Sequence, residues 1–444
     1  MQQRRDAAAD LGEGLHPWLQ NRLLVNYTEG RSAAFGQGSG FEWHVREWSR
    51  VAVGNLQPVN LLGDEEGLVA MRGGLEFEAY TEHLEFRIRP ELRLDVGCRE
   101  DPVCGSAPLT EAVLGVNWKG VRLDVGLEDR SAGPGARGNL ILGQSIQPWP
   151  AGTLQYSRDS RWGLWAAETG VGWLPGERED VLNPGLMHMD FRYSPVAALE
   201  FGFTRATMFG GQGRPMPTLF DLLIPIQPHV TGDPDRLLAD SNEIVAVDAR
   251  LDIPIRRWLE SPLKRLSLWV QYAGEDMILS EVGSVPVPSL GGPANLYGGA
   301  LSFGQSELRI ERAQLMDDTF RWYTRHRIYH EGFVRDGQPI GHPHGGDADS
   351  LWVEWATYGA LLGYSLHAEK LRRVGVVTAI PEGVFTLATE EHSVRGGFKF
   401  WVMPSRGGHF GIGYSVQRMT GEDFVANTLQ WRHRGWVELT RPFR

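Results

Sequence analysis

The sequence predicts an all-β chain that forms a large antiparallel transmembrane β-barrel, and three observations support this. Apolar and polar residues alternate with a period of two along most of the 444 residues. The polar positions of these stretches carry Glu, Asp and Arg on one strand after another. Trp and Tyr recur near the ends of the expected strands, where the aromatic girdles of a membrane barrel lie.

The alternation is clearest in four stretches that lie far apart in the chain. They read LEFRIRPELRLDV at 84–96, VRLDV at 121–125, VAVDARLDI at 245–253 and FGIGYSV at 410–416. A period of two puts all apolar side chains of a strand on one face. Further strands are separated by glycine-rich turns, which we expect at 72–74, 291–293 and 406–408. This is too many strands for a single β-sandwich.

The charged face alone does not distinguish a soluble β protein from a membrane barrel, and the aromatic residues are needed as a second criterion. A soluble sandwich turns its polar face to outside water, whereas a membrane barrel turns apolar groups to lipid and charges to a wet lumen. Periodicity alone fits both classes. Strand number and girdle aromatics favour the barrel, while core tryptophans of a soluble protein are the alternative. The girdle candidates are Trp43, Trp48, Trp149, Trp162, Trp173, Tyr272, Trp322, Tyr329, Trp401 and Trp436.

Composition excludes other classes. A net charge of -11 argues against a nucleic-acid partner, which would need a basic surface. No apolar run reaches the roughly 18–20 residues of a membrane helix. The first residues, MQQRRDAAADLGEGLHPW, have no apolar core of a secretory signal. A soluble cytoplasmic β protein therefore stays open, beside a barrel whose signal peptide is absent from this chain.

Cys98 and Cys104 lie six residues apart in the turn-rich segment GCREDPVCG. This spacing does not suit a zinc site, which would need more ligands nearby. In an oxidising compartment the two residues can close a small disulfide loop, and otherwise they are ordinary thiols at a hairpin end.

Two segments break the strand rhythm. The prolines of 216–239 predict short helical turns in a long loop, and the Gly, His and Asp residues of 336–350 predict another loop. In the second loop, four side chains are the best metal candidates: His342, His344, Asp347 and Asp349. The alternative is a polar loop folded back into the lumen. We favour the alternative and predict neither a metal nor another cofactor.

Motifs of common enzymes are missing from the sequence. It contains no G-x-S-x-G elbow, no P-loop and no H-E-x-x-H zinc motif. Carboxylates are so frequent that any two could be taken for a glycosidase pair, so this signal has no specificity. We predict no catalytic residues and no enzyme activity.

Several segments in order resemble the capsule assembly Wzi family over roughly residues 65 to 440. They are Gly143–Ser145, Trp149–Pro150, Arg161–Trp162, Asn183–Met187, Gly210–Pro215, Ser241–Asn242, Asp248, Arg250, Pro254, Tyr272–Asp276, Tyr329, Glu331–Gly332, Gly341–His342, Gly345 and Asp347–Asp349. The C-terminal run 436–443 also resembles the last strand of an outer-membrane barrel, with Arg444 after the usual final aromatic residue.

The resemblance implies an outer-membrane barrel of about eighteen strands, whose lumen is plugged by short helices in extracellular loops. It implies a lectin that attaches capsular polysaccharide to the surface of a Gram-negative cell, and neither an enzyme nor the export channel. Residues 1–64 are shorter than the family pattern. We therefore divide the chain into an atypical N-terminal segment with the first strands (1–64) and the barrel (65–444).

A lectin would stack sugar rings on Trp and Tyr and bind sugar carboxylates with Arg, which is abundant here while Lys is scarce. Base composition of the source genome explains the arginines equally well. The expected partners are surface polysaccharide, outer-membrane lipid and the barrel assembly machinery, and we expect a monomer. A porin-like channel and a glycan- or lipid-acting enzyme are the alternatives. The expected ligand contacts are Arg214, Asp221, His342, His344, Asp347 and Asp349.

Overall fold

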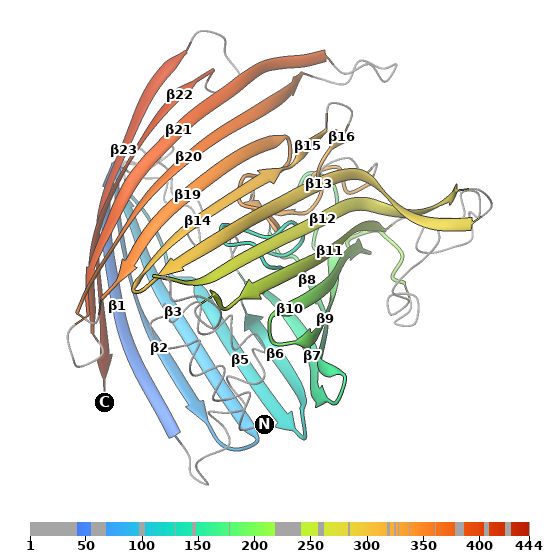
Figure 1. The fold of residues 1–444 in the computed structure, drawn as a ribbon, viewed down its shortest axis with the longest axis horizontal. Coiled ribbons are helices and arrows are strands. Elements are labelled where there is room, and N and C mark those ends of the chain that lie inside the picture. Colours follow the sequence, from blue (N-terminus) through green and yellow to red (C-terminus); the bar gives the residue numbers. More distant parts are fainter. Residues whose placement is uncertain are drawn as a thin grey trace.

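The computed structural model shows one antiparallel sheet closed into a barrel of eighteen strands, because its last strand pairs with its first (Figure 1). One strand position of the barrel, next to β3, is shared by two shorter strands, because β4 and β5 both pair with β3. The structure describes residues 42–54, 68–96, 103–128, 130–143, 148–176, 178–217, 241–255, 262–282, 285–317, 320–323, 326, 328–336, 338–359, 361–377, 386–403, 408–421 and 428–443.

The strands of the barrel are β1 (Glu42–Gly54), β2 (Val69–Tyr80), β3 (Leu84–Val96), β4 (Val103–Ser106), β5 (Leu109–Trp118), β6 (Val121–Glu128), β7 (Trp149–Ser160), β8 (Gly163–Trp173), β9 (Gly185–Val196), β10 (Leu199–Phe209), β11 (Asn242–Ile253), β12 (Leu263–Val282), β13 (Val285–Phe303), β14 (Ser306–Gln314), β19 (Ala348–Tyr358), β20 (Leu362–Val377), β21 (Thr386–Val402), β22 (His409–Thr420) and β23 (Leu429–Phe443). Two small hairpins lie between β14 and β19: β15 (Met316–Asp317) with β16 (Phe320–Arg321), and β17 (Val334–Arg335) with β18 (Gln338–Pro339).

Burial along the strands is the reverse of that in a soluble protein. In β3, Phe86 and Leu92 are exposed, while their neighbours Arg87 and Arg93 are buried. In β6, from Val121 to Val125, the apolar residues are likewise exposed while Arg122 and Asp124 are buried. Apolar side chains therefore cover the outside and charged side chains line the inside, as in a transmembrane barrel. This decides between the two classes of β protein that periodicity left open.

The two ends of the barrel differ in the length of their connections. One end has short turns, among them Lys119–Gly120, Arg161–Trp162 and Gly304–Gln305. The other end has the long connections 129–148, 174–184, 210–241 and 315–347. Because short turns face the periplasm and long loops face outward in such barrels, the first end is the periplasmic one. β1 begins and β23 ends at this same end.

Only part of the predicted aromatic girdle lies on the outside. Trp43 and Trp162 are exposed at the periplasmic end, and Trp173 is exposed at the other end. Trp149, Trp322 and Tyr329 are instead buried inside the barrel, so their assignment to a girdle was wrong. Aromatic residues near a strand end can face either lipid or lumen, and only the register decides which.

Two of the three expected glycine turns were also wrong. Residues 72–74 lie within β2 and 291–293 lie within β13. A Cβ at Gly74 would come within 2.7 Å of the Trp48 indole of the neighbouring strand. This glycine makes room for a ring lying flat on the wall and does not turn the chain.

The irregular segments are only partly described. Most of 216–239, including the expected short helical turns and Asp221, lies outside the described residues. Among the described residues, none lies in a helix long and apolar enough to cross a membrane. Cys104, on β4 at the long-loop end, is disulfide-bonded. Cys98, the only other cysteine of the sequence, lies outside the described residues.

Candidate functional site in the lumen

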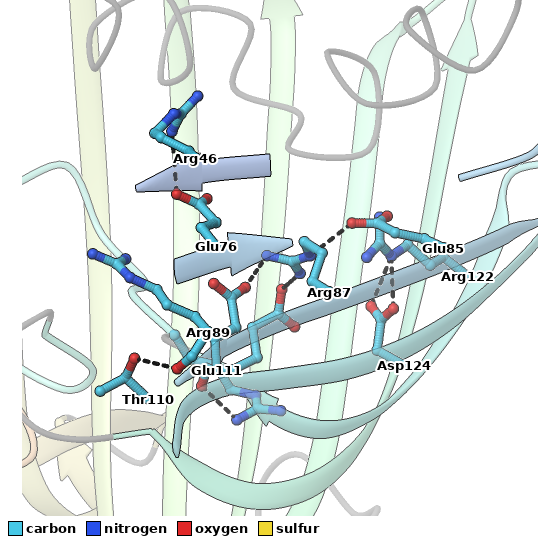
Figure 2. A network of polar contacts seen from close by, with 11 residues as sticks. Arg46, Glu76, Glu85, Arg87, Arg89, Thr110, Glu111, Arg122 and Asp124 are labelled. Atoms are coloured by element: carbon cyan, nitrogen blue, oxygen red, sulfur yellow. Dashed lines mark hydrogen bonds and ion pairs between the residues drawn. The ribbon is translucent and has the colours of Figure 1, made fainter. Parts of the chain in front are cut away.

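Ion pairs cover much of the inner wall, and Figure 2 shows one group of them on β1, β2, β3, β5 and β6. Arg87 contacts Glu85 at 2.7 Å and Glu128 at 2.5 Å, and it also pairs with Glu111. Arg122 bridges to Glu85 at 2.9 Å. Buried charges cost too much free energy to stay unpaired, so Arg87 and Arg122 are each held by carboxylates from their own strand or from strands one or two positions away. This part of the wall is a closed network.

A plug of three connecting segments fills part of the lumen. The plug comprises the described residues of 130–143, 174–184 and 322–347. Arg178 joins the second segment to the third, because its guanidinium donates to the carbonyl oxygens of Val334 at 2.6 Å and Gly332 at 3.1 Å. The Tyr323 hydroxyl donates to the carbonyl of Leu140 and so joins the third segment to the first.

The plug also has an apolar core shared with the barrel wall. Leu140, Ile141 and Phe333 have essentially no exposed surface. Beside larger side chains such as Met208, Ile244 and Leu296, the wall contributes many alanines to this core: Ala206, Ala246, Ala273, Ala294, Ala313 and Ala348. Short side chains leave space for a backbone segment to pack closely against the strands.

His344 connects the plug to the wall strand β20. Its Nε2 lies 2.7 Å from Glu369 Oε1, and both side chains are almost completely buried. Arg137, from the first plug segment, reaches the same carboxylate at 3.4 Å. Glu369 is therefore shared by two plug segments. Glu311 of β14 adds a second polar attachment, because it accepts from the backbone N–H groups of Ala136 at 2.5 Å and Arg137 at 2.8 Å.

His342 packs against the first plug segment. A Cβ at Gly138 would lie 2.9 Å from the His342 ring and 2.5 Å from Pro343, so only glycine allows this close approach. The His342 backbone N–H donates to the Tyr323 hydroxyl at 2.9 Å. This segment is therefore a polar loop folded back into the lumen, which is the second of the two interpretations that the sequence allowed.

Burial keeps both imidazoles neutral. The pKa of His342 is well below its usual value, first because of burial and then because of His344 and Arg137. The pKa of His344 is also lowered by burial, although Glu369 opposes that shift. A neutral His344 donates its Nε2 proton to the Glu369 carboxylate, and this favours the docked plug.

The other predicted ligand contacts lie elsewhere. Asp349 is the second residue of β19 and pairs with Arg312 at 2.9 Å, with both side chains partly exposed. Asp347 has a positive φ of 59°, and its backbone bonds to Leu315 and Val374. Arg214 is exposed in the turn after β10. Within the described part of the chain, no three or more His, Cys, Asp or Glu side chains group as metal ligands.

A second lumenal feature lies on β1 and β21–β23, away from the plug core. Three indole rings there lie flat on glycines of the next strand: Trp48 on Gly74, Trp401 on Gly363 and Trp436 on Gly413. At each of these glycines, an added Cβ would come within 2.2–2.7 Å of the ring. The glycines thus set the orientation of three aromatic faces.

Cations lie over these rings. Arg89 lies 5.3 Å from the Trp48 ring, Arg50 lies 5.1 Å from Trp436, and Lys399 lies 5.3 Å from Trp436 and 5.8 Å from Trp401. Figure 2 shows the Arg89 side chain reaching away from the neighbouring ion pairs. Within the described residues, Arg50, Arg89 and Lys399 form no ion pair. We call these three cations and three tryptophans the cation–aromatic belt.

Sequence reasoning missed the residues that matter most to the plug, Arg137 and Glu369. A signal was present, since 131–143 reads SAGPGARGNLILG. Its glycines and proline end strand periodicity, and its last residues form an apolar run. The glycines beneath the belt tryptophans carried no comparable signal, because the two residues of each pair lie on different strands.

A family model, capsule assembly protein Wzi, matches residues 66–400. The chain belongs to the Wzi family. No curated protein matches the chain. A solved structure from Escherichia coli, Wzi, is 17% identical and has a TM-score of 0.65. The similarity covers 95% of this chain and 88% of that one, which is described as a carbohydrate-binding β-barrel involved in group 1 capsule assembly.

Two Pseudomonas aeruginosa structures share the fold at lower similarity to this Wzi-family chain. OccK5 is 10% identical with a TM-score of 0.51, covering 91% of this chain and 98% of its own. OprD is 12% identical with a TM-score of 0.52, covering 92% and 95%. At these identities the likeness concerns the fold alone. Family and fold together place the chain in the outer membrane of a Gram-negative bacterium.

Proposed function

We propose that this Wzi-family barrel binds an acidic capsular or other surface polysaccharide and anchors it to the cell surface. The observation that carries the proposal is the cation–aromatic belt. Flat indole faces bind the C–H faces of sugar rings, and cations without a close ion pair attract sugar carboxylates, although Arg50 also interacts electrostatically with Glu438 on β23. The E. coli relative, described as carbohydrate-binding, supports this choice of ligand class.

The plug supports a binding protein over a diffusion channel. It attaches to the wall through Glu369 and packs on an apolar core, so the lumen is obstructed by chain that is fixed in place. We further propose that the protein binds its glycan without transforming it. His342 and His344, the best candidates for proton transfer, are both buried and engaged within the plug.

Contact of the polysaccharide with the six residues expected from the sequence stays a prediction. The buried positions of His342 and His344 support an indirect contribution, through the plug, and exposed Arg214 suits direct contact. We also propose that the protein is a monomer that the barrel assembly machinery inserts among outer-membrane lipids. Closure of the sheet by pairing of β1 with β23 within one chain supports the monomer.

The test is binding of purified barrel in detergent to an acidic capsular polysaccharide and to a neutral dextran, measured by calorimetry. We expect binding of the acidic polymer and an affinity lower by about fivefold to tenfold in Trp436→Ala, since a stacked ring contributes roughly 1 kcal/mol. Trp173→Ala, which removes an exposed ring from the outer wall, is the matched control.

Equal affinity of wild type and Trp436→Ala for the acidic polymer would remove the belt from the proposal. Ion conductance of the unmodified barrel in planar bilayers would favour the channel instead. A shortened polymer recovered after incubation would favour the enzyme.

A further inference from the structure

The outer wall has a hollow at the periplasmic end that the lumenal function does not use. It has a volume of about 770 Å³ and lies over the hairpin of β7 and β8 and the adjacent strand β9. Its lining residues are Tyr156, Arg158, Ser160, Arg161, Trp162, Trp165, Ala166, Ala167 and Phe191. These positions include the turn Arg161–Trp162, so the hollow lies where the bilayer meets the periplasm.

The hollow has a small floor between aromatic walls. In the sheet register, Ala167 lies between Tyr156 of β7 and Phe191 of β9. Both rings are about two-fifths exposed, at 41% and 40%, so they project from the wall and leave a groove over the alanine. The groove has the apolar surface that an acyl chain needs.

One side of the hollow is fixed by stacking. Trp165 stacks on Tyr193 with ring centroids 4.0 Å apart, and the Tyr193 hydroxyl donates to the Trp162 carbonyl at 2.8 Å. Ser160 accepts the Trp162 backbone N–H at 3.2 Å and donates to the Gly163 carbonyl at 2.8 Å. These bonds hold the hairpin turn in place before any ligand arrives.

Two cations stand at the mouth of this groove. Arg158 lies opposite Trp165 in the register, and the guanidinium of Arg161 lies 4.7 Å from the Trp162 ring. Both arginines are exposed, and neither forms an ion pair within the described residues. This contrasts with the lumenal wall, where arginines such as Arg87 and Arg122 are each held by several carboxylates.

We propose that the hollow binds one anionic phospholipid of the periplasmic leaflet. Arg158 and Arg161 contact the headgroup phosphate, for which the guanidinium fork is well suited. One acyl chain lies in the groove over Ala167. Trp162, which is 65% exposed, lies at the level of the headgroups, as interfacial tryptophans do. Basic side chains beside apolar surface at this depth are the usual chemistry of headgroup recognition.

The experiment is native mass spectrometry of the whole barrel, equilibrated in mild detergent with equal amounts of phosphatidylglycerol and phosphatidylcholine. We expect wild type to retain one phosphatidylglycerol in preference to phosphatidylcholine. In Arg158→Gln/Arg161→Gln, retention falls on the order of thirtyfold, since each cation near the surface contributes about fivefold. Arg418→Gln, which removes an outward-facing arginine from β22, leaves retention unchanged.

A second variant tests the groove without touching the charges. Ala167→Phe fills the floor between Tyr156 and Phe191, and we expect it to lose the lipid while keeping both arginines. The shift in gel mobility on heating shows for each variant that the barrel has closed. Equal phosphatidylglycerol retention by wild type and the double arginine variant, or retention by Ala167→Phe, would overturn the proposal.

Inorganic phosphate separates a headgroup site from a free-anion site. We expect phosphate at millimolar concentration to leave the lipid bound, because the acyl chain contributes to affinity. Full displacement of the lipid by phosphate would show a simple anion site and overturn the assignment. A second copy of the barrel in place of lipid in the mass spectrum would also overturn it.

Discussion

Two arcs of the inner wall differ in the side chains that they present to the lumen. The arc from β10 to β19 presents alanines such as Ala246 and Ala294, and the plug packs on them. The arc of β1 and β21–β23 presents the flat rings of Trp48 and Trp436 instead, with cations above them. Alanines admit chain from the same protein, and Trp269, which lies on Gly298 of the same arc, is buried with the plug core and donates to Glu311. The rings of the other arc have cations above them and leave a surface for a ligand. The choice of side chain at lumen-facing positions thus divides structural from binding surface.

The largest expected effect comes from removing an attachment of the plug to its arc of the wall. Glu369→Ala leaves Arg137 and His344 without their shared acceptor, and loss of one partner from a buried pair costs about 3–5 kcal/mol. We expect the plug to leave its position and the barrel to conduct ions in planar bilayers.

Glu76→Gln is the control for this change, since Glu76 pairs with a largely exposed Arg46 and such pairs contribute about 1 kcal/mol or less. If Glu369→Ala stays as closed as wild type, Glu369 is not the main attachment of the plug.

The next largest effect concerns polysaccharide affinity and tests the arc of β1 and β21–β23. In Arg50→Gln/Lys399→Gln both cations over Trp436 are lost while the ring remains. We expect affinity for an acidic polysaccharide to fall by about tenfold, with a weaker salt dependence. Plug position and conductance stay as in wild type. A plug that opens in this variant would show that the two arcs are not independent.

A smaller effect, the pH dependence of plug docking, should also distinguish the two arcs. A detached plug takes up protons on His342 and His344 near the ordinary pKa of about 6.5, whereas burial in the docked plug lowers the pKa of both. Docking stability is therefore complete above this pH and decreases as the pH falls below it. The opening free energy of residues 130–143, obtained from hydrogen exchange after correction for the intrinsic exchange rate at each pH, should decrease between pH 7 and pH 5.

His344→Gln tests the source of this pH dependence. Glutamine keeps a donor for Glu369 but does not titrate, so the decrease in opening free energy should be smaller in the variant. An unchanged pH profile would assign the effect to other groups.

The smallest effect concerns the edge of the plug. Asp349→Asn weakens a pair with Arg312 in which both side chains are partly exposed, so we expect a change of about 1 kcal/mol or less in unfolding free energy. Calorimetry in detergent measures it. A large loss of stability, or a large loss of polysaccharide binding, would give Asp349 a role that its position does not indicate.

Much of the barrel was predictable from the sequence. The charged face of 84–96 and of 121–125 indicated a wet interior, and burial in β3 and β6 confirms it. The loop containing His342 and His344 was predictable as a loop, because its glycines and prolines exclude a regular strand. Its fold into the lumen was one of two alternatives that local residue types could not separate.

The candidate site was less predictable, because it consists of contacts between distant segments. Arg137 and Glu369 meet only when a connection between β6 and β7 reaches β20. Trp436 meets Gly413 because β22 and β23 pair in one particular register. A shift of one residue would turn that ring to lipid.

The sequence by itself determined an all-β chain whose strands have one apolar and one charged face, since both features depend only on neighbours along the chain. The tertiary structure decided that the charged face lies inside the barrel. It also decided which loops close the lumen, which tryptophans face inward and which cations lack carboxylate partners. Those features depend on strand register and on the long connections. Local sequence constrains neither, because contacts across the sheet are set by closure of the whole barrel.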